Sequence, residues 1–168
     1  MITMHIPPGY NIYDHSPFWS QKEKESFLAI VAAYQDNIIG MLASHTHYEE
    51  LKVVKDKFNK PIAGVYLTAA LSTMHGNAPS VKTFYYGSEK GRWSLTNYDA
   101  FGFSVQNENL IFHKLYDYRQ YYCDARPSQL TQCLGQVTIY KIKKYFSAGN
   151  PNFAGRMESP EDVFLSAF

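Results

Sequence analysis

SQKEKESFLAIVAAYQDNIIGMLASHTH, residues 20–47, is the stretch that decides the fold of this chain. Ser20 followed by Glu23 is a capping-box pattern, which predicts the start of a helix. Apolar side chains then recur on one helical stripe: Phe27, Ile30, Val31 and Tyr34. Residues 37–43, NIIGMLA, form a short continuous apolar run that is typical of a buried strand. The stretch therefore predicts a helix followed by a strand.

Another apolar segment lies before this helix. Residues 1–6, MITMHI, are typical of the end of a strand, which Pro7, Pro8 and Gly9 would stop. A strand, a helix and a strand in this order form a βαβ unit. Its two strands are expected to be parallel and joined by a right-handed crossover.

The segments after residue 47 have a different pattern. Four of them are strand-like and are joined by short links, which favours antiparallel pairing. They are ELKVVK (50–55), PIAGVYLT (61–68), VKTFYY (81–86) and RWSLTNY (92–98). Residues 116–146 look mainly helical with a break at Pro127, and residues 159–168 look like a last short helix. We therefore expect an α/β fold in two parts, residues 1–100 and a mainly helical extension, residues 101–168.

Composition limits the class of protein. A chain of 168 residues with 45% hydrophobic and 18% charged residues suits one folded domain with a real core. A formal net charge of +1 argues against a nucleic-acid polymer as partner. The apolar runs are far shorter than the roughly 20 residues of a membrane helix, and the start of the chain does not have the pattern of a signal peptide.

Histidines follow both strands of the predicted βαβ unit. His5 ends the first strand, and His45 and His47 come directly after the second. The carboxyl ends of parallel strands meet at one edge of a sheet, so the three imidazoles are expected to converge. Imidazole is a common ligand of zinc and similar divalent ions. A metal site and incidental polar residues in a loop both remain open from this spacing alone.

Three motifs in a set order carry a family resemblance. They are HIPPG (5–9), SHTHYEELKVV (44–54) and LSTMHGNAPSVKTFYY (71–86). Together they resemble the C-terminal half of the acid sphingomyelinase-like branch of the calcineurin-type metallophosphoesterases, over residues 4–86. The resemblance implies a partial calcineurin-like αββα sandwich, a βαβ unit followed by antiparallel strands. Two features depart from the family, Ser44 in place of the usual glycine and Ala-Pro-Ser at 78–80 in place of Asn-Pro-Gly.

The resemblance also implies a reaction and its residues. His5 and His45 would bind one ion of a two-metal centre, zinc in this family, and His47 would bind the other. The loop that holds His75 and Asn77 would border the substrate. The intact protein would hydrolyse a phosphodiester, a lipid or a nucleotide, with a metal-bound hydroxide.

Part of that chemistry is missing from the sequence. Two dications close together need a bridging carboxylate, yet the family's D-x-H, G-D-x-x-D and G-N-H-[DE] motifs are absent from the 168 residues. We therefore expect a C-terminal fragment that has no catalytic residue of its own and is inactive alone. Its partner surface would be covered by an N-terminal half or, without that half, by self-association.

Other residues have two readings each. Glu49 and Glu50 suggest a solvated strand start, or support for a metal-binding histidine. YKIKKYF (140–146) suggests a solvated helix face, or peripheral contact with an anionic membrane.

Cys123 and Cys133 bracket a loop that contains Pro127, which suits a disulfide, and the family resemblance favours a secreted or oxidising compartment. The rival to the enzyme hypothesis is a non-catalytic α/β binding module with an aromatic interaction surface.

Overall fold

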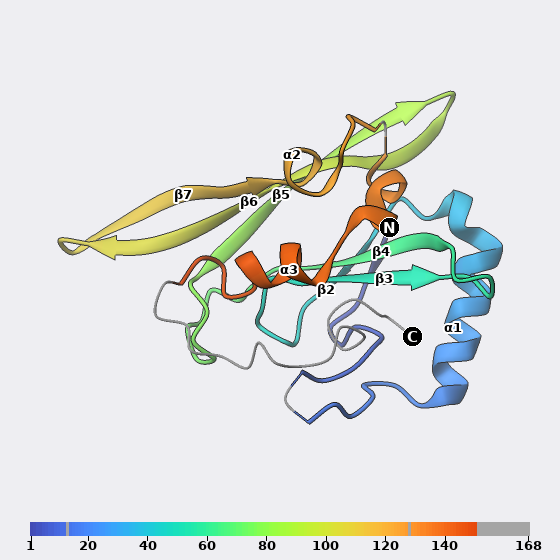
Figure 1. Cartoon of the computed structure of the whole chain (residues 1–168), viewed down its shortest axis with the longest axis horizontal. Coiled ribbons are helices and arrows are strands. Elements are labelled where there is room, and N and C mark those ends of the chain that lie inside the picture. The colour runs from blue at the N-terminus through green and yellow to red at the C-terminus, as the bar shows by residue number, and fades with distance from the viewer. Residues whose placement is uncertain (13, 128, 151–168) are drawn as a thin grey trace.

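A computed structural model describes residues 1–12, 14–127 and 129–150 of the chain. The chain forms two β-sheets with helices beside them (Figure 1). The first sheet has the strand order β1-β2-β4-β3. Its strands are β1 (Ile2–Thr3), β2 (Met41–Ala43), β3 (Leu51–Lys55) and β4 (Pro61–Leu67). The expected mixed α/β fold is confirmed.

The first sheet contains the predicted βαβ unit. β1 pairs with β2 in parallel, with Ile2 opposite Met41, and helix α1 (Gln21–Tyr34) connects them. β2 also pairs in parallel with β4, whereas β3 and β4 are antiparallel. The carboxyl ends of β1 and β2 therefore lie side by side, and this arrangement positions the residues that follow them.

Helix α1 begins where the capping box predicts. The Ser20 side chain accepts a hydrogen bond from the backbone N–H of Glu23, and the Glu23 carboxylate accepts one from the backbone N–H of Ser20. Val31 is fully buried and belongs, with Met41, to the apolar cluster beneath the helix. Burying one side chain of this kind stabilises the fold by about 1.5–3 kcal/mol. The predicted stripe is only partly covered, because Ile30 and Tyr34 are 54% and 59% exposed.

The second sheet is an antiparallel meander with the order β5-β6-β7. Its strands are β5 (Ser80–Glu89), β6 (Arg92–Gln106) and β7 (Asn109–Asp117). The hairpin of β6 and β7 extends away from the first sheet (Figure 1). The sequence did not predict β7, and β6 continues well beyond the strand expected at residues 92–98. The division into residues 1–100 and 101–168 stays a prediction, although β6 runs through residue 100.

Helical segments follow the second sheet, as expected for residues 116–146. They are α2 (Tyr118–Tyr122), the 3₁₀ helix η2 (Leu130–Gln136) and α3 (Ile139–Tyr145). A further 3₁₀ helix, η1 (Gln35–Asn37), directly follows α1. A disulfide joins Cys123 to Cys133 and ties the end of α2 to η2, which confirms the predicted bond. The last helix expected at residues 159–168 lies outside the described residues.

A core rich in tyrosine holds the two sheets and the C-terminal helices together. The ring of Tyr98 on β6 lies 5.7 Å from that of Tyr66 on β4 and 5.0 Å from that of Tyr118 on α2, between centroids. Tyr116 and Tyr122 belong to the same buried cluster. Much of the high aromatic content therefore serves packing, because buried aromatic pairs add to the stability that area burial provides.

Candidate functional site

Of the three imidazoles predicted to converge, those of His5 and His45 meet at the carboxyl ends of β1 and β2. Nε2 of His5 and Nδ1 of His45 lie 3.2 Å apart, although forty positions separate the residues. Nδ1 of His5 lies 3.0 Å from the hydroxyl oxygen of Ser44, and the Phe18 ring packs edge-on against His45. Two imidazole nitrogens therefore face each other at this edge of the sheet.

The backbone of the SHTH turn directs its two histidines. His45 and His47 have φ values of 76° and 66°, a left-handed conformation that costs energy and therefore depends on the contacts around it. The Ser44 N–H donates to the carbonyl of His5, at 3.1 Å, and the Thr46 N–H donates to that of Ser44, at 3.0 Å. Ser44 is not among the described residues with positive φ, so its replacement of the family glycine creates no strain.

Burial lowers the pKa of His45, and the neighbouring rings of His5 and His47 lower it further. A lowered pKa keeps the imidazole neutral at physiological pH. The neutral ring is the form that binds a metal ion, so the setting of His45 suits a ligand.

His47 turns toward the loop predicted to border the substrate. The ring centroids of His47 and His75 lie 4.8 Å apart, edge to face. Nδ1 of His47 is buried and has no hydrogen-bond partner within residues 1–12, 14–127 and 129–150. A buried polar atom without a partner is costly in a folded protein. It marks a place where a ligand would be favoured.

Asn77 shapes the loop around His75. Its side-chain amide donates to the carbonyls of Ala70 and Ser72, both at 3.0 Å, and to that of Ala78, at 3.1 Å. Asn77 is buried, and its Oδ1 has no hydrogen-bond partner in the described part of the chain. The amide group thus holds the loop, while His75 is exposed.

Glu49 and Glu50 are buried, 3% and 2% exposed, so the interpretation as a solvated strand start is wrong. Glu49 pairs with Lys82 of β5 and accepts a hydrogen bond of 2.6 Å from the Tyr116 hydroxyl. Glu50 pairs with Lys52, at 2.8 Å. Desolvation lowers the pKa of Lys82, and Glu49 opposes this effect. This buried network fixes the chain directly after His47.

The donors present fit part of a metal centre. Imidazoles are good zinc ligands, and the paired nitrogens of His5 and His45 and the buried Nδ1 of His47 are suited to that role. However, the described residues include no group of three or more His, Cys, Asp or Glu side chains placed to hold one ion. A complete coordination sphere therefore needs ligands in addition to these.

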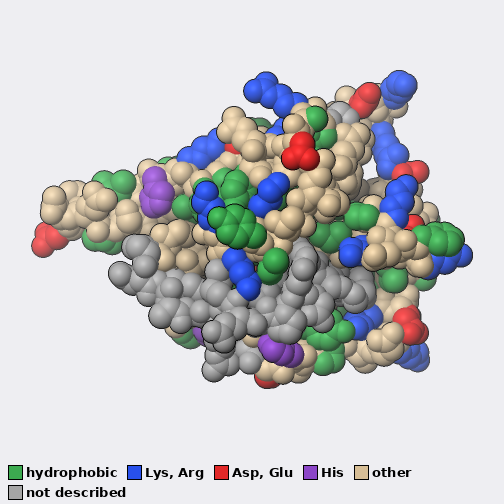
Figure 2. Space-filling view, viewed as in Figure 1, with side chains coloured by type: hydrophobic (Ala, Val, Ile, Leu, Met, Phe, Trp, Pro, Cys, Tyr) green, Lys and Arg blue, Asp and Glu red, His purple; other side chains and the backbone are tan. Residues whose placement is uncertain are grey.

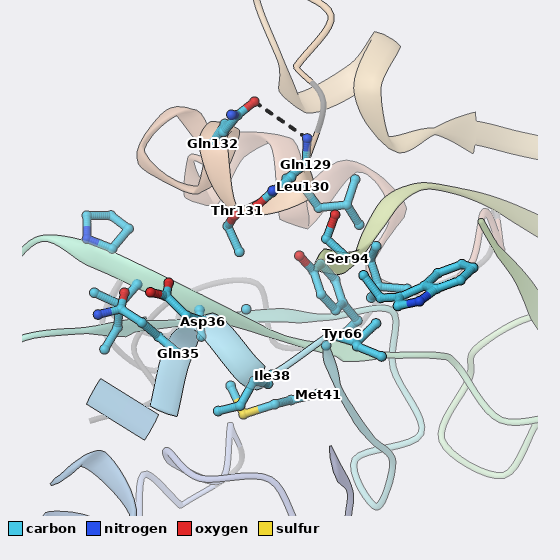
Figure 3. A pocket seen from close by; sticks show the side chains of 18 of the residues that line it. Gln35, Asp36, Ile38, Met41, Tyr66, Ser94, Gln129, Leu130, Thr131 and Gln132 are labelled. Atoms are coloured by element: carbon cyan, nitrogen blue, oxygen red, sulfur yellow. Dashed lines mark hydrogen bonds between the residues drawn. The ribbon is translucent and has the colours of Figure 1, made fainter. Parts of the chain in front are cut away.

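A pocket lies elsewhere, and the histidines do not line it. Its volume is about 290 Å³, and it opens between the start of β4, the start of β6 and η2. Tyr66, Leu130 and Thr131 surround it in Figure 3. No group among its lining residues resembles the metal-binding set, so we assign no chemistry to it.

The basic-aromatic segment predicted at residues 140–146 lies on the surface. Lys and Arg side chains surround hydrophobic ones over α3 in Figure 2. Tyr140 is exposed, and the Lys144 ammonium lies 5.5 Å and 5.3 Å from the ring centroids of Tyr121 and Tyr145. None of the helices in the described ranges has both the length and the apolar character that crossing a bilayer requires. Peripheral membrane contact stays a prediction.

The resemblance to the acid sphingomyelinase-like phosphodiesterases is confirmed by comparison with curated proteins. The relatives found are cyclic GMP-AMP phosphodiesterases SMPDL3A of mammals. The mouse protein is 29% identical over 116 residues, 65% of this chain and 26% of the relative. The bovine protein is 29% identical over 159 residues, 86% and 34% of the two chains. The human protein is 24% identical over 168 residues, 89% and 35%.

The chain therefore spans about a third or less of the length of these relatives. No family model matches it. The chain is therefore similar to part of these phosphodiesterases, and its disulfide between Cys123 and Cys133 is compatible with an oxidising compartment.

Proposed function

We propose that this chain supplies part of the metal centre of a phosphodiesterase. His5 and His45 would bind one divalent ion, and His47 would bind a second. The observation that carries the proposal is the 3.2 Å approach of His5 Nε2 to His45 Nδ1 at the ends of two parallel strands. Both residues lie within the HIPPG and SHTH stretches that carry the family resemblance.

A pair of divalent ions, when bound, would polarise a phosphoryl oxygen and lower the pKa of water. The residues of the chain have separate tasks. Neutral imidazoles donate their lone pairs, and Ser44 orients the ring of His5. His75, exposed beside His47, would contact the phosphodiester. The substrate class, a lipid or nucleotide phosphodiester, rests on the resemblance.

Catalysis is expected to need more than these residues. The described part of the chain has no cluster of three or more His, Cys, Asp or Glu side chains that could hold a metal ion, so a bridging carboxylate would have to come from elsewhere. The isolated chain should therefore bind zinc weakly and leave bis(p-nitrophenyl) phosphate intact. An in-frame coding stretch before Met1 with D-x-H and G-N-H-[DE] motifs would supply the remaining groups.

Zinc titration of the 168-residue chain tests the proposal. His45→Ala should lower the zinc affinity by about tenfold or more, since even groups that only support a ligand contribute that much. His113→Ala is the matched control, because His113 lies on β7 in the projecting hairpin. Equal zinc affinity of the His45→Ala variant and the unmodified chain would remove His45 from the site and end the proposal.

A binding module is the second candidate, and an exposed aromatic surface favours it. Tyr85, Tyr86 and Trp93, which lie toward the turn between β5 and β6, are all exposed. Such a surface suits a protein partner, because aromatic side chains bury a large area at low entropic cost. This candidate would be favoured if the chain binds no zinc and the coding sequence before Met1 contains no metal-ligand motifs.

A further inference from the structure

The segment Phe146–Asn150, here called the C-terminal turn, contacts both loops of the candidate site. Its first residue, Phe146, contacts the residues that directly follow the SHTH turn (44–47). The carbonyl of Phe146 accepts a hydrogen bond of 2.9 Å from the backbone N–H of Glu49. The Phe146 ring also stacks on that of Tyr48, with centroids 4.3 Å apart. Tyr48 directly follows His47, so this end of the C-terminal turn fixes the chain next to a proposed metal ligand.

The rest of the C-terminal turn holds the loop that contains His75. The carbonyl of Ser147 accepts a hydrogen bond of 2.8 Å from the N–H of Ala78. The side-chain amide of Asn150 donates to the carbonyl of Gly76, at 2.7 Å. Ser147 and Asn150, which hold the loop at Gly76 and Ala78, therefore come from the C-terminal end of the described chain.

A third contact joins the two loops directly. The Tyr48 hydroxyl donates to the carbonyl of His75, at 2.9 Å. Tyr48 itself is held by the Phe146 ring, so the C-terminal turn, the SHTH side and the His75 loop form one connected set. Loops are the mobile parts of a fold unless such contacts hold them.

The backbone of the C-terminal turn has an unusual conformation. Ala148 and Gly149 have φ values of 55° and 81°, and the Ala148 N–H donates to the carbonyl of Tyr145, at 2.7 Å. A Cβ atom at Gly149 would lie 2.9 Å from Leu115 Cδ2. Glycine therefore suits this position for two reasons, the positive φ and the lack of space for a side chain. Ala148 is not a glycine, so its positive φ persists only where surrounding contacts hold it.

We propose that Asn150 is a positioning residue, which with the backbone of the C-terminal turn fixes His75 beside His47. The proposal rests on the proposed function, because it assigns the turn to the geometry of that site. A binding site needs its groups held to within about 0.5 Å, and here that support comes from the C-terminal extension. The extension would thus be a part of the site's framework.

The experiment compares Asn150→Ala with a matched control in the 168-residue chain. Asn109→Ala removes an equivalent bond, from an Asn side-chain amide to the carbonyl of Asn107, at the tip of the projecting hairpin. Nuclear magnetic resonance of histidine-labelled protein reports the contact between the rings of His47 and His75. Amide exchange reports the hydrogen bond from Ala78.

Asn150→Ala should weaken the ring-to-ring contact and speed exchange at Ala78 by about fivefold, with exchange in β4 unchanged. Asn109→Ala should change neither quantity. An unaltered ring contact and an unaltered Ala78 exchange rate in Asn150→Ala would overturn the proposal. Faster exchange throughout β4 would also overturn it, because Asn150 would then support the whole fold and not the site.

These readouts are independent of metal. If wild-type protein binds no zinc while Asn150→Ala still separates His75 from His47, the proposed function fails and the positioning role stands. If zinc binds through His45 and the ring contact survives in Asn150→Ala, the positioning role fails and the proposed function stands.

Discussion

The hydroxyl oxygen of Ser44 lies 3.0 Å from Nδ1 of His5, and the Ser44 N–H donates to the His5 carbonyl. The residue that departs from the family glycine therefore contacts a proposed ligand twice. With Nδ1 facing Ser44, the opposite ring nitrogen, Nε2, faces His45. Ser44 is thus placed to fix the orientation of the His5 ring.

Ser44→Ala should lower zinc affinity by about tenfold, because the His5 ring loses the group that orients it. Titration of the chain with zinc measures this change. Ser26→Ala is the control, since the Ser26 hydroxyl bonds a carbonyl within α1, remote from the site. If both variants bind zinc equally well, Ser44 does not orient a ligand.

Lys82→Met should destabilise the fold by about 3–5 kcal/mol, because it leaves the Glu49 carboxylate buried and without its cation. Urea denaturation measures the free energy of unfolding. The control is Lys114→Met, which breaks the half-exposed ion pair with Asp99 and should cost at most about 1 kcal/mol.

The double variant Glu49→Gln with Lys82→Met sharpens this test. Neutralising Glu49 removes the unpaired charge, so stability should return in part relative to Lys82→Met. A double variant as unstable as the sum of the single ones would show that the charge pair is not the cause.

Local signals account for the features that the sequence predicted. The capping box of Ser20 and Glu23 lies within one helical turn, so its effect does not depend on the rest of the fold. The approach of His5 to His45 followed from the βαβ order, because that order places both strand ends at one edge. Each of these predictions needed only neighbouring residues or one topological rule.

Contacts between distant segments account for the rest. Glu49, which precedes β3, can be buried because Lys82 on β5 neutralises it, and the local sequence does not contain that partner. Asn150 reaches Gly76 across 74 positions without any repeating pattern. The sequence does not predict β7, because its apolar residues Leu110–Phe112 form a run without the alternation typical of a half-buried strand. In the structure the side chains of this run are exposed.

The projecting hairpin predicts self-association of the isolated chain. Val105 and Leu110 face each other across the strands and are 73% and 64% exposed, next to the exposed Phe112. An apolar patch of this kind favours contact between copies. Sedimentation of the chain over a range of concentrations should show association, and Leu110→Lys should shift it toward monomer. Asn109→Lys is the control, and a monomer at all concentrations would contradict the prediction.

Loss of the disulfide should lower the free energy of unfolding by about 2–3 kcal/mol, as expected for a loop closed by cysteines ten positions apart. The double variant Cys123→Ser, Cys133→Ser tests this in thermal denaturation. A reducing agent should lower the stability of the unmodified chain equally and leave the variant unchanged. An effect of the reducing agent on the variant would point to another cause.

The tyrosine core predicts unfolding at alkaline pH. Burial raises the pKa of Tyr66, Tyr98, Tyr116 and Tyr122 well above the usual value. The folded chain therefore keeps these protons as the pH rises past about 10, whereas the unfolded chain loses them. Since the unfolded state then binds fewer protons, stability falls by about 1.4 kcal/mol per pH unit for each group.

Lys82 opposes this trend, because its lowered pKa makes the unfolded chain bind more protons between that value and the usual one, but it is one group against several. Circular dichroism should show unfolding together with a rise in phenolate absorbance. Tyr98→Phe removes one titrating group and should make the pH dependence of the unfolding free energy less steep by one such increment. Phenolate formation near pH 10 by all the tyrosines of a chain that stays folded would contradict the prediction, because the buried hydroxyls would then ionise within the native core.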